Sequence, residues 1–142
     1  MVERLVVVGA GAIGRAIAGL LADAGVPVVL VDRRCGPVPR PIDLRFPDRS
    51  RQVAVPRVGS VVAAAPTAAD LVAIAVMEHH TADVLDVLDP GVPVVSLQNG
   101  VTRLDRIADR GHPTLAGVVF LPAERRGIDA VALPGDPVPG GV

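Results

Sequence analysis

The chain has 142 residues, 50% of them hydrophobic, and a formal net charge of −1. This length indicates one globular domain, and because no cluster of basic residues stands out, nucleic-acid binding is not expected. No uncharged apolar run reaches the roughly 18 residues of a membrane-spanning helix, the first residues lack the pattern of a signal peptide, and the single cysteine cannot form an intrachain disulfide, so we expect a cytoplasmic protein without membrane attachment.

The first third of the chain predicts a strand, a glycine-rich turn, a helix and a second strand. The apolar run Leu5–Val8 leads directly into Gly9–Gly14, and apolar residues then recur at helical spacing over Ala12–Ala24. A second apolar run, Val28–Val31, ends at Asp32. This order of elements is typical of the first unit of a nucleotide-binding α/β fold.

The turn has the pattern G-x-G-x-x-G, with glycines at positions 9, 11 and 14. The first glycine allows a tight turn, the second leaves room for a pyrophosphate beside the backbone, and the third lets the helix pack closely on the strand. Amide groups at the helix N-terminus attract phosphate oxygens. The alternative is a glycine-rich turn that binds nothing. We predict cofactor contacts from six consecutive residues, Gly9, Ala10, Gly11, Ala12, Ile13 and Gly14.

The residues after the second strand bear on the choice of dinucleotide. An acid at this place binds the ribose hydroxyls of NAD, whereas an arginine accommodates the 2′-phosphate of NADP. The sequence has both, as Asp32, Arg33 and Arg34. Two adjacent guanidinium groups can make charge-assisted contacts with a phosphate, so we predict NADP, with NAD as the alternative. Arg34 is either a phosphate ligand or a solvated loop residue.

The middle of the chain predicts an irregular β insert followed by further α/β units. Residues 33–59 contain five prolines and no helical period, and we expect short strands at Ile42–Phe46 and Gln52–Val55. After this insert, the pattern of apolar residues predicts a strand, a helix and a strand, at Leu71–Val76, Thr81–Leu88 and Val92–Leu97.

The last third predicts another helix and two late strands. The helix starts at Thr102, which forms a capping-box-like pair with Asp105, and the strands cover Thr114–Leu121 and Ile128–Leu133. The alternation of strands and helices predicts an α/β, Rossmann-like, doubly wound and mostly parallel sheet with helices on both faces. We assign residues 1–133 to this dinucleotide-binding domain and residues 134–142 to a Pro/Gly-rich tail.

Three segments resemble the N-terminal domain of ketopantoate reductase (2-dehydropantoate 2-reductase). They are the glycine turn, the strand Asp70–Val76, and Val94–Val101, which contains the distinctive loop Gln98-Asn99-Gly100. The stretch 117–128, with Glu124-Arg125-Arg126-Gly127, is also similar to the family. The resemblance implies an NADP-dependent oxidoreductase that reduces a 2-keto acid by hydride transfer from NADPH, as in pantothenate biosynthesis.

The resemblance also implies roles for individual residues. Arg33 matches the arginine that grips the 2′-phosphate, and Val76 ends the strand that leads to the nicotinamide. Asn99 matches the loop asparagine near the reacting carbon and is the one candidate catalytic residue; its amide can both donate and accept hydrogen bonds. Because Asn-Gly is also a common turn pair, a purely structural role for Asn99 stays open.

Two departures from the family limit the implied activity. Where the family usually has a lysine after its strand, this chain has Met77, followed by Glu78, His79 and His80. A histidine there could supply a proton, but no further Cys/His pattern completes a metal site, and we predict no metal. The family's helical C-terminal domain, with its proton-donating lysine and substrate-binding glutamate, is absent from these 142 residues, so turnover of a 2-keto acid would need a second domain.

The departures leave a second interpretation open, a non-catalytic NAD(P)-binding module or a truncated gene product. A methyltransferase that uses S-adenosylmethionine would also have a glycine-rich turn, but the spacing and the arginines fit a dinucleotide better. The face that meets the second domain in the family is expected to be apolar, and a homodimer could cover it.

Overall fold

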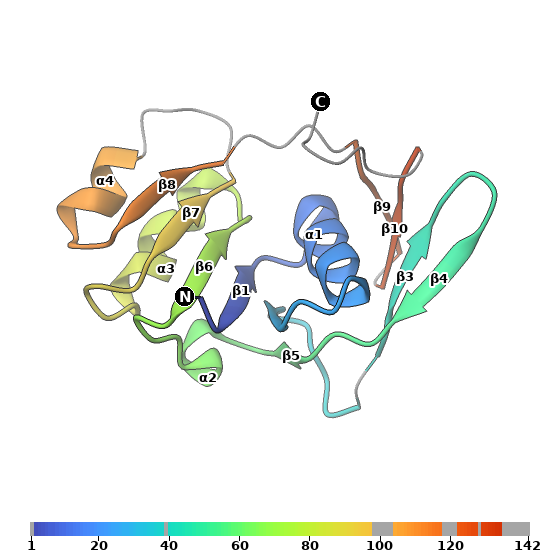
Figure 1. Cartoon of the computed structure of the whole chain (residues 1–142), viewed down its shortest axis with the longest axis horizontal. Coiled ribbons are helices and arrows are strands. Elements are labelled where there is room, and N and C mark those ends of the chain that lie inside the picture. Colours follow the sequence, from blue (N-terminus) through green and yellow to red (C-terminus); the bar gives the residue numbers. More distant parts are fainter. Residues whose placement is uncertain (1, 39, 98–103, 118–121, 128, 135–142) are drawn as a thin grey trace.

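The computed structural model describes residues 2–38, 40–97, 104–117, 122–127 and 129–134. A six-stranded sheet runs through the molecule in the order β5-β2-β1-β6-β7-β8, and every neighbouring pair is parallel (Figure 1). Its strands in chain order are β1 (Arg4–Val8), β2 (Val28–Val31), β5 (Arg57–Val58), β6 (Asp70–Ile74), β7 (Val94–Ser96) and β8 (Thr114–Ala116).

Side chains of the central strands alternate between two hydrophobic cores. Val6 and Val72 face one core, whereas their neighbours Val7 and Ala73 face the other. All four are at most 2% exposed. A parallel sheet that is covered on both faces has this pattern, because successive side chains of a strand point to opposite sides. The Val-rich strands therefore form the centre of the molecule.

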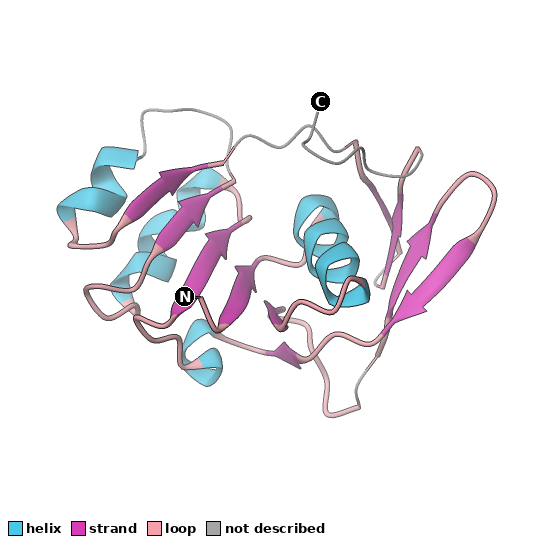
Figure 2. Ribbon diagram, in the orientation of Figure 1, coloured by secondary structure: helices cyan, strands magenta, loops and turns pink. Residues whose placement is uncertain are grey.

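Helices cover both faces of this sheet (Figure 2). The helix α1 (Ala12–Asp23) packs on one face, and α2 (Val61–Ala64), α3 (Thr81–Asp86) and α4 (Leu104–Asp109) contribute to the core on the other. A short 3₁₀ turn, η1 (Glu78–His80), precedes α3. The predicted Rossmann-like, mostly parallel sheet with helices on both faces is confirmed. Among the described residues, no helix has the length and apolar character needed to cross a membrane.

A second, four-stranded sheet lies over the outer side of α1, at the right of Figure 1. Its order is β4-β3-β10-β9, with β3 and β10 parallel and the two outer pairs antiparallel. The strands are β3 (Ile42–Arg45), β4 (Ser50–Val53), β9 (Glu124–Arg126) and β10 (Ala130–Ala132). On α1, Gly19 leaves room for Leu44, because a Cβ there would lie 2.8 Å from Leu44 Cδ2. The first helix is thus enclosed between two sheets.

The structure confirms most predicted elements and adds several. The first helix ends at Asp23, and the β insert contains the expected pair of strands, β3 and β4. The sequence did not predict β5, α2 or β9, nor that the late strand expected at Ile128–Leu133 pairs with β3 in a separate sheet. Short strands and non-local pairing have little periodic signal. The predicted helix start at Thr102 and the tail residues 135–142 lie outside the described residues.

Candidate functional site

The glycine turn lies where the direction of the sheet's connections changes. From β1 the chain passes to β2 on one side, and it later crosses to β6 on the other side of β1. Ligands of open α/β sheets bind at such a switch point, outside the carboxyl ends of the strands. The predicted contact residues Gly9–Gly14 connect the end of β1 to α1, so the structure places all six at this edge.

Two of the three glycines are required by close backbone contacts. Gly9 has φ +114°, which disfavours other residues, and a Cβ there would lie 2.9 Å from the carbonyl group of Ala75, just after β6. At Gly14 a Cβ would overlap the carbonyl oxygen of Gly9. The turn is therefore compact, and it holds the start of α1 against the ends of β1 and β6.

The third glycine borders open space. A Cβ at Gly11 would meet nothing within 4 Å, and Gly11 caps α1 without any side-chain hydrogen bond to the helix. In an α-helix the first backbone N–H groups have no intrahelical acceptor, and here they belong to Ala12, Ile13 and Gly14. The first turn of α1 carries no acidic residue. This end of the helix can therefore accept an anionic group such as a pyrophosphate.

Asp32 follows β2 at the same edge, but its carboxylate faces inward. The side chain is 6% exposed. Its Oδ1 atom accepts a hydrogen bond from the backbone N–H of Arg34 at 2.9 Å, and its Oδ2 atom lies 3.4 Å from Nη1 of Arg57. The carbonyl oxygen of Asp32 also accepts from the backbone N–H of Cys35 at 2.9 Å. These contacts hold the turn after β2 in place.

The turn presents two arginines to solvent. Arg33 and Arg34 are both exposed, and neither guanidinium has an ion-pair partner among the described residues. They lie at the carboxyl end of β2, next to the strand that leads into the glycine turn. An arginine pair without a carboxylate partner can bind a phosphate through charge-assisted hydrogen bonds.

Val76 and the residues that follow it lie on the β6 side of the switch point. Val76 is half-buried and packs against a hydrophobic core, and Met77, at the position of the expected lysine, is 71% exposed. The rings of His79 and His80 have centroids 4.0 Å apart. Among the described residues, no cluster of three metal-binding side chains occurs. Asn99 lies outside the described residues, so its predicted role stays a prediction.

Sequence reasoning missed two buried arginines near the site. Arg57, on β5, bridges Asp32 and Asp129 from a side chain that is 7% exposed. Arg15, on α1, is 2% exposed and donates from Nη1 to the carbonyl oxygens of Gly127 and Ala130. Burial, and then the positive charge of Arg125, hold the pKa of Arg15 below its ordinary value, although an arginine stays charged at neutral pH.

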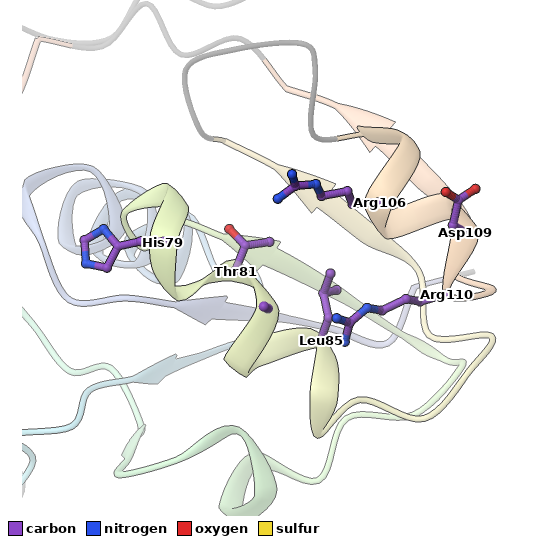
Figure 3. A pocket seen from close by; sticks show the side chains of 7 residues that line it. His79, Thr81, Leu85, Arg106, Asp109 and Arg110 are labelled. Carbon is purple, nitrogen blue, oxygen red and sulfur yellow. The ribbon is translucent and has the colours of Figure 1, made fainter.

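A cavity of about 650 Å³ lies elsewhere, between α3 and α4 (Figure 3). Leu85 and Thr81 line it from α3, and Arg106 and Arg110 from α4. Arg110 also pairs with Asp86. The lining includes no residue of the glycine turn or of the end of β2. We therefore do not assign this cavity as the dinucleotide site, despite its volume.

The sheet, the switch point and the glycine turn define a Rossmann-like α/β domain whose turn has the geometry found in dinucleotide-binding proteins. Within this class, the chain belongs to the ketopantoate reductase PanE/ApbA family, whose model matches residues 5–136. The predicted family is thereby confirmed. A comparison with curated proteins found no match.

Solved structures similar to the chain include reductases of this family. 2-Dehydropantoate 2-reductase from Geobacter metallireducens is 22% identical, with a TM-score of 0.80 over 94% of this chain and 46% of that one. A PanE/ApbA family ketopantoate reductase from Ralstonia eutropha is 28% identical, with a TM-score of 0.73 over 96% of this chain and 50% of that one. D-Mandelate dehydrogenase, solved with NADH and anilino(oxo)acetate, is 19% identical, with a TM-score of 0.74 over 94% and 46%. The chain thus spans about half the length of these proteins.

Proposed function

We propose that the chain is the NADP-binding domain of an oxidoreductase of the 2-dehydropantoate 2-reductase type. The observation that carries this proposal is the pairing, at one edge of the sheet, of an open glycine turn with the two exposed arginines after β2. Family membership supports a nicotinamide dinucleotide as the ligand, and so does the NADH in the similar D-mandelate dehydrogenase.

The residues of this edge fit the parts of NADPH. The space beside Gly11 and the free amide groups of α1 suit the pyrophosphate, and the exposed guanidinium groups of Arg33 and Arg34 suit the 2′-phosphate. The half-buried Val76 follows β6, on the side that we propose for the nicotinamide. When bound, the cofactor would supply a hydride to the carbonyl carbon of a 2-keto acid, while the protein binds and orients both.

Among the described residues that follow β6, Met77 stands where the lysine is expected and cannot donate a proton. His79 could donate one, but it is exposed. Asn99 remains the proposed contact to the substrate or to the cofactor near the reacting carbon. We place the remaining groups that bind and protonate a 2-keto acid outside the described residues, in agreement with the half-length match to the solved reductases.

An NAD-binding or non-catalytic module is the alternative. The buried acid Asp32 at the end of β2 favours NAD, and the exposed Met77 favours a domain without its own catalysis. We prefer NADP because the Asp32 carboxylate is already bound within the protein, whereas the two arginines are free to bind an anion.

Titration of the chain with NADPH and with NADH in a calorimeter tests the proposal. We expect NADPH to bind more tightly, and we expect the Arg33→Ala, Arg34→Ala double variant to lose at least about tenfold in NADPH affinity, the effect of one lost charge-assisted hydrogen bond. Arg45→Ala, which removes an exposed arginine from β3, is the control. Absence of binding to either dinucleotide would refute the proposal. Oxidation of NADPH on addition of 2-dehydropantoate would separate an enzyme from a binding module.

A further inference from the structure

A group of paired charges, with Arg57 and Asp32 buried at its centre, lies beside the proposed site, and none of the roles above uses it. Nη1 of Arg57 is 2.9 Å from Asp129 Oδ1 and 3.4 Å from Asp32 Oδ2, and its Nη2 donates to the carbonyl oxygen of Pro41 at 3.3 Å. Arg40 also pairs with Asp129, at 3.2 Å. Arg57 thus connects the end of β2 to the start of β10 in the second sheet.

Arg57 and the backbone of Arg34 occupy both oxygens of the Asp32 carboxylate. In NAD-binding domains, an acid at this place accepts hydrogen bonds from the ribose hydroxyls. Here the carboxylate is 6% exposed and turned toward Arg57. A dinucleotide that needs Asp32 as its ribose acceptor therefore has to compete with the protein's own donors.

Arg57 also offsets the charge of Asp32. A 2′-phosphate bound to Arg33 and Arg34 would lie next to the Asp32 carboxylate, and like charges at short range repel each other. The guanidinium of Arg57, itself 7% exposed, is placed to cancel this repulsion. Meanwhile Asp32 keeps its hydrogen bond to the backbone of Arg34, which holds the turn that carries both exposed arginines.

We propose that Arg57 is a positioning residue that determines cofactor specificity, by binding Asp32 and so favouring NADP over NAD. This inference rests on the proposed function, because it concerns the same dinucleotide site. Arg57 does not touch the cofactor in this mechanism. Arg57 acts through Asp32. Its removal should therefore change the preference for NADPH over NADH, rather than weaken the binding of both dinucleotides equally.

The main test compares the dissociation constants of NADPH and NADH for the wild-type chain and Arg57→Met. Removing Arg57 takes away the ion-pair partner of Asp32 and frees Oδ2 for a ribose hydroxyl. We expect the preference for NADPH to fall by at least about tenfold, as for the loss of one hydrogen bond to a charged group. In the double variant Asp32→Asn, Arg57→Met the repelling charge is gone, so we expect most of the preference to return.

Two further variants separate this mechanism from a general effect on folding. Arg51→Met removes an arginine that pairs with Asp23 at 2.8 Å, at the end of α1 opposite to the glycine turn, and it should leave the preference unchanged. Asp129→Asn releases Arg57 from its second carboxylate while leaving Asp32 paired, so the preference should stay at or above the wild-type value. This variant keeps the inference testable if Arg57→Met does not fold.

The outcomes distinguish the inference from the proposed function. If the wild-type chain binds neither dinucleotide, the proposed function fails. If the wild type prefers NADPH and Arg57→Met weakens the binding of both dinucleotides equally, Arg57 has only a structural role and the inference is overturned. A fall in the preference in Asp129→Asn, or no recovery in the double variant, would overturn it as well.

Discussion

At the residue scale, the glycines of the turn after β1 have different physical tasks. A side chain at Gly14 would overlap the backbone of Gly9, so its absence lets α1 approach the strand. A side chain at Gly11 would project into open space, so nothing in the fold itself requires a glycine there. We attribute the room beside Gly11 to the proposed ligand, whereas the contact at Gly14 is explained by packing.

Alanine substitutions should separate these two tasks. Gly14→Ala should lower the free energy of unfolding by about 1–3 kcal/mol, because the backbone has to move to admit the methyl group. Gly11→Ala should leave stability almost unchanged, since its φ of −74° suits alanine, but it should weaken NADPH binding. Denaturant unfolding and calorimetry measure the two effects. Gly36→Ala, also in open space, is the control, and undiminished NADPH affinity of Gly11→Ala would contradict the assignment.

Much of this site could be predicted from the sequence, because its signals are local. The glycine pattern and the residues Asp32, Arg33 and Arg34 after β2 each occupy a few consecutive positions. Their places in the structure follow from the order of strand, turn and helix. The partner of Asp32 could not be predicted, because Arg57 lies 25 positions away on a two-residue strand that has no periodic signal. The two residues of an ion pair that forms only in the tertiary structure have no characteristic separation in the sequence.

At the element scale, the second sheet explains why Arg15, a charged residue of α1, is only 2% exposed. The charged residues of an amphipathic helix ordinarily face solvent. The β9–β10 hairpin instead covers Arg15, and its backbone carbonyls accept hydrogen bonds from the guanidinium at 2.7 and 3.2 Å. Arg15 therefore joins the first helix to a hairpin more than 100 residues later.

Replacing Arg15 by leucine should weaken this connection. The carbonyl oxygens of Gly127 and Ala130 would lose their buried donor, and a buried group without its partner costs about 1–3 kcal/mol. We expect the free energy of unfolding to fall by that amount in denaturant titrations. Arg106→Leu, on the exposed side of α4, should change it little. Equal stability of both variants would show that the hairpin does not depend on Arg15.

The packing of α1 against β3 can be tested with a matched pair of leucines. Leu44 is completely buried between the second sheet and α1, whereas Leu115, on the edge strand β8, is 59% exposed. Leu44→Ala should therefore cost about 2–5 kcal/mol, the usual effect of a core cavity, and Leu115→Ala much less. If denaturant unfolding gave similar losses of free energy of unfolding for both variants, the second sheet would not be an integral part of the fold.

At the scale of the whole molecule, the fold concentrates positive charge that the composition hides. The formal net charge is −1, yet Arg33 and Arg34 lie at the same edge of the sheet as the N-terminus of α1, and Arg57 compensates the acid beside them. Composition alone argued only against nucleic-acid binding. The topology brings β1, β2 and β6 together and so forms the edge at which we propose that the dinucleotide binds.

Salt should therefore weaken the binding of NADPH more than that of NADH. The two dinucleotides differ by the 2′-phosphate, which adds between one and two negative charges at neutral pH. The Debye length falls from about 10 Å at 0.1 M salt to about 3 Å at 1 M. Salt therefore screens the attraction between this phosphate and the exposed arginines that we propose bind it. Over this range we expect the preference for NADPH to decrease by roughly tenfold in calorimetric titrations. The Arg33→Ala, Arg34→Ala variant should show nearly the same salt dependence for both dinucleotides. Parallel salt dependences in the wild type would instead place the 2′-phosphate away from these arginines.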